Sequence, residues 1–135
     1  MTITICGSMQ FHKEMAQTQK LLEKLGFSVI MPKDFYNLAN NEAYMESDEE
    51  RITVKIEYDF IREHFRKIQQ ADAILVLNHD KKGIKNYIGG NTFLEMGVAF
   101  WLDKKYFFST PFPRRIILPK CTPCSRWLLP ATLPK

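Results

Sequence analysis

Cysteine is scarce in this sequence, with three residues among 135. Cys6 lies in the first apolar segment, far along the chain from the pair Cys121 and Cys124, so no disulfide framework is expected. The pair forms a lone Cys-x-x-Cys, and no histidine stands at a zinc-ribbon spacing from it. Neither a disulfide-stabilised secreted domain nor a zinc ribbon is therefore predicted.

Long apolar runs are also absent, and none approaches the roughly 20 residues of a membrane-spanning helix. Residues 1–6 carry no Lys or Arg before their apolar run and are too short for a secretory signal, so we interpret them as a first strand. A length of 135 residues suits a single core. We expect a cytoplasmic domain without a membrane partner.

The formal charge of +4 is concentrated near the C-terminus. Residues 109–135 contain five basic residues and no acid, whereas residues 1–108 contain 14 basic and 15 acidic residues. A nearly neutral body offers no continuous surface for a phosphate backbone. Nucleic acid is therefore not an expected partner.

Strand and helix signals alternate along residues 2–108. Apolar, β-branched or aromatic runs predict strands, and three- and four-residue apolar spacing predicts helices. The expected strands are 2–6, 27–31, 73–77 and 106–108, and the expected helices are 8–25, 47–70 and 92–102. This order favours a three-layer flavodoxin-like or Rossmann-like parallel sheet with helices on both faces, and ligands bind at the carboxyl ends of such strands.

The last 26 residues differ in kind from the rest. Residues 110–135 hold six of the seven prolines and show no periodic pattern. We therefore divide the chain into an α/β domain, residues 1–109, and a Pro-rich basic tail, residues 110–135, whose composition favours mobility over packing.

A glycine-rich segment precedes the last expected helix. Gly83, Gly89 and Gly90 precede this helix, where backbone N–H groups and the helix dipole can meet a phosphate or a sugar hydroxyl. The segment lacks the Lys-Ser/Thr ending of a nucleotide-triphosphate loop and the three-glycine spacing of a dinucleotide site. ATPase and dehydrogenase functions are therefore excluded.

Two carboxylates are candidates for catalysis. Glu95 follows the glycines, but Thr92-x-x-Glu95 also has the spacing of a capping box, in which the carboxylate would only bind a backbone N–H. Asp59 falls within the long expected helix beside Tyr58, where it is either a solvated surface acid or part of a site. Residue types alone leave both choices open.

Taken together, several segments resemble the nucleoside 2-deoxyribosyltransferase-like family, which includes deoxynucleotide N-glycosidases. The matching segments are Ile5-Cys6-Gly7-Ser8, Tyr58-Asp59, Gln70-Ala71-Asp72-Ala73 and Gly89-Gly90-Asn91-Thr92-Phe93-Leu94-Glu95-Met96-Gly97. Their order matches over residues 3–108. The resemblance implies that Glu95 is the nucleophile and that Asp59 serves the sugar and proton transfer.

The resemblance further implies cleavage or transfer at the N-glycosidic bond of a 2-deoxynucleoside or its 5′-monophosphate through a covalent glycosyl-glutamate. It implies no metal or organic cofactor, and a homodimer or larger homo-oligomer. We expect the substrate to be bound by Gly7, Ser8, Tyr87, Gly89, Gly90 and Asn91. Phe93, beside the glycines, is interpreted either as a second flank of the base or, preferably, as a core residue.

The sequence departs from the family pattern in two places. Gly7-Ser8 is not followed by the arginine of phosphate-selective members, so Lys82, Lys85 or Ser8 would have to bind a 5′-phosphate. The tail does not resemble family C-termini. Two alternatives stay open: a nucleotide- or nucleoside-binding module without catalysis, and a phosphoribohydrolase of the cytokinin-activating type, whose Pro-Gly-Gly-x-Gly-Thr-x-x-Glu segment is distantly similar to residues 89–95.

Overall fold

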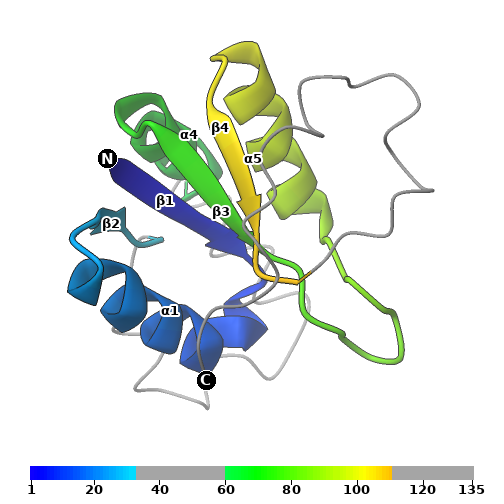
Figure 1. The fold of residues 1–135 in the computed structure, drawn as a ribbon. Coiled ribbons are helices and arrows are strands. Elements are labelled where there is room, and N and C mark those ends of the chain that lie inside the picture. The colour runs from blue at the N-terminus through cyan, green and yellow to red at the C-terminus, as the bar shows by residue number, and fades with distance from the viewer. Residues whose placement is uncertain (33–59, 111–135) are drawn as a thin grey trace.

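The computed structural model describes residues 1–32 and 60–110, which form a parallel sheet with helices on both faces (Figure 1). The strands are β1 (Thr2–Gly7), β2 (Ser28–Ile30), β3 (Ala73–Leu77) and β4 (Lys105–Phe108). They are hydrogen-bonded in the order β2-β1-β3-β4, and each neighbouring pair is parallel. This arrangement confirms the predicted flavodoxin-like fold class.

After β1, the chain adds β2 on one side of β1 and then returns to add β3 and β4 on the other side. From β1 it passes through α1 (His12–Lys24) to β2 on one side, and later elements place β3 and β4 on the other side. The carboxyl ends of β1 and β3 are adjacent, with Gly7 paired to Leu77. In open parallel sheets, ligands bind where the connections diverge in this way. The fold therefore directs attention to the residues that follow Cys6 and Leu77.

Alternation along β1 distributes its side chains between two helical layers. Ile3 and Ile5 join clusters that include residues of α1, whereas Cys6 joins a cluster with Ile68 of α4 (Phe60–Gln70) and Ala99 of α5 (Gly90–Trp101). Figure 1 shows α1 on one side of the sheet and α4 and α5 on the other. All five residues of β3 are buried, as the continuous apolar run predicted.

The first helix begins later than residue 8. Ser8 precedes a short 3₁₀ turn, η1 (Met9–Phe11), and α1 starts at His12. The Ser8 side chain makes no capping hydrogen bond, because its hydroxyl accepts a hydrogen bond from Lys81 Nζ at 3.0 Å instead. The 3₁₀ turn also places Phe11 in the core beside Met15. Ser8 is therefore available to the carboxyl edge of the sheet rather than to the helix.

The last helix begins earlier than expected, and this corrects the capping-box interpretation. Gly89 is the N-cap and α5 starts at Gly90, so Thr92 is the third helical residue and Glu95 lies beyond the first turn. Glycine is accepted at an N-cap, and Gly89 has the extended conformation that the position requires (φ −76°, ψ 165°). The Glu95 carboxylate is consequently not a helix cap.

The expected helix 47–70 is described from Phe60 onward, and its first part lies outside the described residues, as does the tail from residue 111. The bounds of β2 and β4 differ from the expected ones by one or two residues, which is usual at element ends. Within residues 1–32 and 60–110, no helix has the length and hydropathy needed to cross a membrane.

A buried asparagine fixes the loop between β3 and α5. Asn78 is fully buried and donates a hydrogen bond to Asn86 Oδ1 at 3.0 Å, while Thr110 N donates to Asn78 Oδ1 at 3.1 Å. The Thr110 hydroxyl also bonds Asn86 Oδ1 at 2.7 Å. Buried amides are costly unless they are paired, so this network ties the loop to the end of β4. It thereby holds Lys81 and Tyr87 in place.

The close pairing of β1 with β3 leaves little room for a side chain at residue 7. A Cβ at Gly7 would lie 3.1 Å from the Leu77 Cβ and 3.3 Å from the Met15 Cε, whereas one at Gly97, on the exposed side of α5, would meet nothing within 4 Å. We expect Gly7→Ala to lower the free energy of unfolding by about 1–3 kcal/mol, because the added methyl group overpacks the site. Gly97→Ala should raise the free energy of unfolding by about 0.5–1 kcal/mol, because alanine favours a helix more than glycine does. Urea unfolding of both variants measures this, and a Gly7→Ala protein as stable as the parent would refute the packing.

Candidate active site

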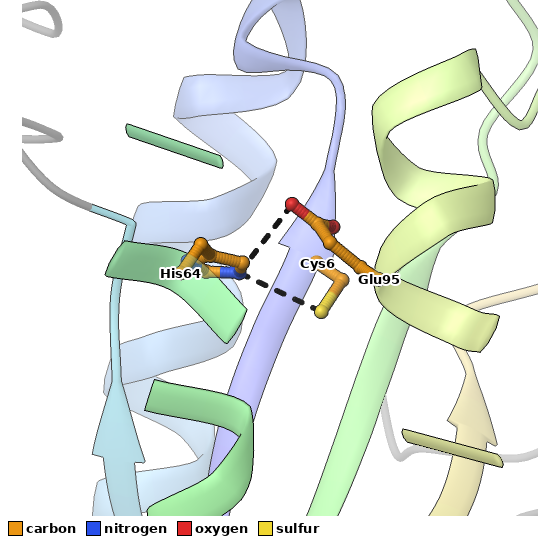
Figure 2. A group of neighbouring side chains, drawn as sticks. All are labelled: Cys6, His64 and Glu95. Carbon is orange, nitrogen blue, oxygen red and sulfur yellow. Dashed lines mark hydrogen bonds and ion pairs between the residues drawn. The ribbon is translucent and has the colours of Figure 1, made fainter. Parts of the chain in front are cut away.

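Three chemically active side chains converge from three elements at the carboxyl end of β1. Figure 2 shows Cys6 on β1, His64 from α4 and Glu95 from α5 with their functional groups turned toward one another. Cys6 Sγ lies 3.6 Å from His64 Nε2, and His64 Nε2 lies 3.7 Å from Glu95 Oε1. One potential ligand atom of each residue lies within 4.8 Å of the others. We refer to these three residues as the Cys-His-Glu cluster.

Helical periodicity explains why the two helical members point inward. On α5, Glu95 falls between the buried residues Thr92 and Ala99, so it occupies the stripe that faces the sheet. On α4, His64 lies one turn before the buried Ile68. Apolar residues normally fill such positions. A histidine and a glutamate there are a signal of function that the spacing of the sequence already contains.

The thiol of Cys6 is held in its neutral form. Cys6 is fully buried. Burial, and secondarily the charge of Glu95 and a hydrogen bond to it, raise the pKa of the Cys6 thiol well above its ordinary value. A protonated thiol can donate a hydrogen bond to a carboxylate. Cys6 therefore acts as a donor toward Glu95 and is not a reactive thiolate.

The imidazole of His64 is also neutral near pH 7. Burial is the largest cause that lowers the pKa of His64 to about 4, and the positive charge of Lys67 lowers it further. A backbone hydrogen bond with Ile5 and the charge of Glu63 oppose this shift without cancelling it. Cys6 and His64 are thus both uncharged, and Glu95 supplies the carboxyl group of the Cys-His-Glu cluster. Its side chain is 13% exposed, so the carboxylate is largely desolvated but reaches the surface.

A second group gathers on the loop beside the sheet edge. Lys81 Nζ donates to Ser8 Oγ at 3.0 Å and lies 4.5 Å from the centroid of the Tyr87 ring. A Cβ at Gly89 would be 3.1 Å from the Tyr87 hydroxyl, so glycine lets the ring approach the start of α5. Ser8, Tyr87 and Gly89, all expected to bind substrate, are thus brought together. Lys81, which the sequence did not single out, joins them; Lys82 and Lys85 are exposed and are not part of these contacts.

The other residues that the sequence singled out for the site lie in different places. Gly90 and Asn91 form the first turn of α5, and a Cβ at Gly90 would meet nothing within 4 Å. Asp59 lies outside the described residues. Phe93 is 60% exposed, so the expectation that it belongs to the core is wrong: Thr92 and Ala99 mark the stripe of α5 that faces the sheet, and Phe93 lies outside this stripe.

No protein-family model and no curated protein sequence matches the chain. Solved structures do resemble it, among them two 2-deoxyribosyltransferases. One is a 2-deoxyribosyltransferase from Leishmania mexicana, with a TM-score of 0.53 and 19% identity over 83% of this chain and 67% of that chain. The other is a 2-deoxyribosyltransferase from the psychrotolerant bacterium Bacillus psychrosaccharolyticus, with a TM-score of 0.49 and 20% identity over 80% of this chain and 71% of that chain.

The chain therefore shares the flavodoxin-like α/β fold of a 2-deoxyribosyltransferase, which is the fold implied by the sequence resemblance. The similarity at this level of identity concerns the backbone. The chemistry of the site depends on the side chains of the Cys-His-Glu cluster and of the loop beside it.

The buried neutral imidazole makes stability depend on pH. The pKa of His64 is about 4 when folded and about 6.5 when unfolded, so the unfolded chain binds the extra proton between these values. Stability is complete above pH 6.5 and falls as the pH drops toward 4. We expect a loss of about 2 kcal/mol between pH 7 and pH 5 from this residue.

Urea unfolding at the two pH values, with chelator present, measures this loss. His64→Leu should remove most of it, because leucine fills a similar volume and does not titrate, whereas His12→Gln should leave it unchanged. An equally steep pH dependence in His64→Leu would show that another group is responsible.

Proposed function

We propose that this protein cleaves or transfers the N-glycosidic bond of 2-deoxynucleosides or their 5′-monophosphates, with Glu95 as the nucleophile. The observation that carries the proposal is the position of Glu95. Its carboxylate lies at the carboxyl end of β1, where the connections of the parallel sheet diverge, and it is turned toward the uncharged side chains of Cys6 and His64 (Figure 2). The 2-deoxyribosyltransferase fold and the sequence resemblance support the same chemistry.

In the first step, a Glu95 oxygen attacks the anomeric carbon of the deoxyribose as the bond to the base breaks. The base leaves with the electron pair of that bond and takes up a proton, and a glycosyl ester remains on Glu95. The sequence resemblance assigns the proton transfer to Asp59. The Cys6 thiol, which donates toward Glu95, would weaken the nucleophile while it is free and stabilise the carboxylate as it departs.

In the second step, water or the nitrogen of a second base attacks the same carbon, and Glu95 leaves as a carboxylate. Hydrolysis results in the first case and transfer in the second. His64 stays neutral throughout, because its pKa is about 4, so it does not neutralise Glu95 by forming an ion pair near pH 7.

Lys81 and Ser8 support a 5′-monophosphate as one form of the substrate. Their 3.0 Å contact places an ammonium group and a hydroxyl side by side just beyond β1. Phosphate oxygens accept hydrogen bonds from both groups. Tyr87, beneath Lys81, has a ring face on which a base or sugar can pack.

The expected homo-oligomer has one supporting observation in the described residues. Phe93, Phe100 and Trp101 of α5 are all more than half exposed. Large apolar side chains grouped on one helix are typical of protein contact surfaces. We therefore retain a homodimer or larger assembly as part of the proposal.

The decisive variant is Glu95→Ala. We expect the parent protein to release free base from at least one member of a panel of deoxynucleosides, deoxynucleoside monophosphates and ribonucleoside monophosphates. Glu95→Ala should lower that rate at least about 10³-fold, because the covalent step is lost. Chromatography of the reaction mixtures measures the base.

Glu23→Gln, an exposed position near the end of α1, is the matched control and should keep full activity. Base release that persists in Glu95→Ala would overturn the role of Glu95. Binding without release from any substrate would indicate a sensing module, and a preference for ribonucleoside monophosphates would indicate a phosphoribohydrolase.

Substitution of Lys81 separates the two substrate forms. We expect Lys81→Ala to raise KM for a deoxynucleoside monophosphate roughly 10–100-fold, since a hydrogen bond to a charged group contributes about 1.5–3 kcal/mol. The KM for the corresponding nucleoside should change little. Lys82→Ala, one residue further along the loop, is the control, and equal effects of the two variants would argue against a phosphate contact at Lys81.

A further inference from the structure

The Cys-His-Glu cluster contains a donor set that the glycosidic reaction does not need. One sulfur, one imidazole nitrogen and one carboxylate oxygen meet at the carboxyl end of β1. Thiolate, imidazole and carboxylate are the three side-chain ligands of zinc, and sites with three protein ligands keep a fourth position for water. The thiol excludes a preference for Mg²⁺ or Ca²⁺, which take oxygen ligands.

The spacing of the three groups fits a tetrahedral ion. With Zn–S at about 2.3 Å and Zn–N or Zn–O at about 2.0 Å, ligand atoms around zinc lie roughly 3.3–3.6 Å apart. The sulfur-to-nitrogen distance is 3.6 Å and the nitrogen-to-oxygen distance is 3.7 Å, and all three atoms lie within 4.8 Å of one another. Small side-chain adjustments would therefore complete the geometry without moving a strand or a helix.

The elements that carry the ligands are held firmly. Cys6 is packed in one core cluster with Ile68 and Ala99, which lie one turn from His64 and Glu95 on their own helices. The three ligands are 0%, 5% and, for the Glu95 side chain, 13% exposed, so the ion would be shielded while keeping a path to solvent past Glu95. Rigid elements that position several ligands favour tight metal binding.

We propose that Cys6, His64 and Glu95 form a Zn²⁺ site whose fourth ligand is water. On binding, the thiol loses one proton to solvent and a Zn–S bond forms, while the neutral imidazole and the carboxylate bind through their lone pairs. The two negative ligands balance the charge of the ion, so the buried centre is neutral. This inference rests on the cluster geometry and stands independently of the proposed glycosidic activity.

The site has a direct consequence if Glu95 is also the nucleophile. A carboxylate bound to Zn²⁺ cannot attack the sugar, so the metal-bound protein would be inactive and chelation would restore turnover. Metal binding and base release are measured separately, so failure of one does not imply failure of the other.

Co²⁺ provides the test, because it replaces Zn²⁺ and gives a sulfur-to-cobalt charge-transfer absorption when a thiolate binds it. The background is the full chain with Cys121→Ser and Cys124→Ser, which removes the competing Cys-x-x-Cys. We expect one equivalent of Co²⁺ to produce the absorption and excess Zn²⁺ to abolish it. Cys6→Ser should eliminate the band.

His64→Leu should weaken Co²⁺ binding at least about 100-fold, since loss of outer-shell partners alone costs 10–100-fold. His12→Gln, outside the cluster, should bind normally. Circular dichroism establishes that each variant is folded.

X-ray absorption of the Zn²⁺-loaded background protein is a second test, which needs no substitution within the cluster. It should show one sulfur at about 2.3 Å with nitrogen or oxygen neighbours at about 2.0 Å. Absence of the charge-transfer band in the folded background protein, its survival in Cys6→Ser, or a zinc shell without sulfur would overturn the proposal.

Discussion

The close parallel pairing of β1 with β3 is the constraint on which the site depends. Gly7 lies against Leu77 with little space for a side chain, and this register fixes which residues of β1 face each helical layer. Cys6 consequently faces α4 and α5, whose own periodicity turns His64 and Glu95 toward it. Ser8, one residue beyond the strand, meets Lys81 of the next loop. Both groups of candidate residues thus follow from the pairing of two strands.

The Cys-His-Glu cluster replaces apolar packing with polar groups at positions that a core normally fills. Burial of polar groups costs free energy unless they are well paired, and here it shifts the pKa of Cys6 upward and that of His64 downward, which keeps both uncharged. A sequence selected for stability alone would place leucine or methionine at residues 64 and 95. The free-energy cost of burying these polar groups is a physical reason to assign the Cys-His-Glu cluster a chemical role.

The sequence was sufficient to predict the parallel sheet, because β3 is a continuous apolar run and the strand and helix signals alternate along the chain. It was insufficient for the start of α5: Thr92-x-x-Glu95 has a capping spacing, but Gly89 provides the N-cap, and Glu95 lies beyond the first turn of the helix. The sequence did not identify His64 as a site residue, because its proximity to Cys6 depends on a contact between residues 58 positions apart. Lys81 could not be distinguished from Lys82 and Lys85, because its contact with Ser8 joins residues 73 positions apart in the chain. Helical spacing can indicate which side chains face the sheet, but it does not indicate which of them meet across the fold.

The proposed reaction requires Glu95 to form a covalent bond to the sugar. Mass spectrometry tests it most directly, on protein quenched in acid during turnover of the best substrate and then digested into peptides. We expect a 2-deoxyribosyl adduct on the peptide that contains Glu95, localised to that residue by fragmentation. An adduct on a different residue, or sustained base release with no adduct on Glu95 at any quench time, would contradict it.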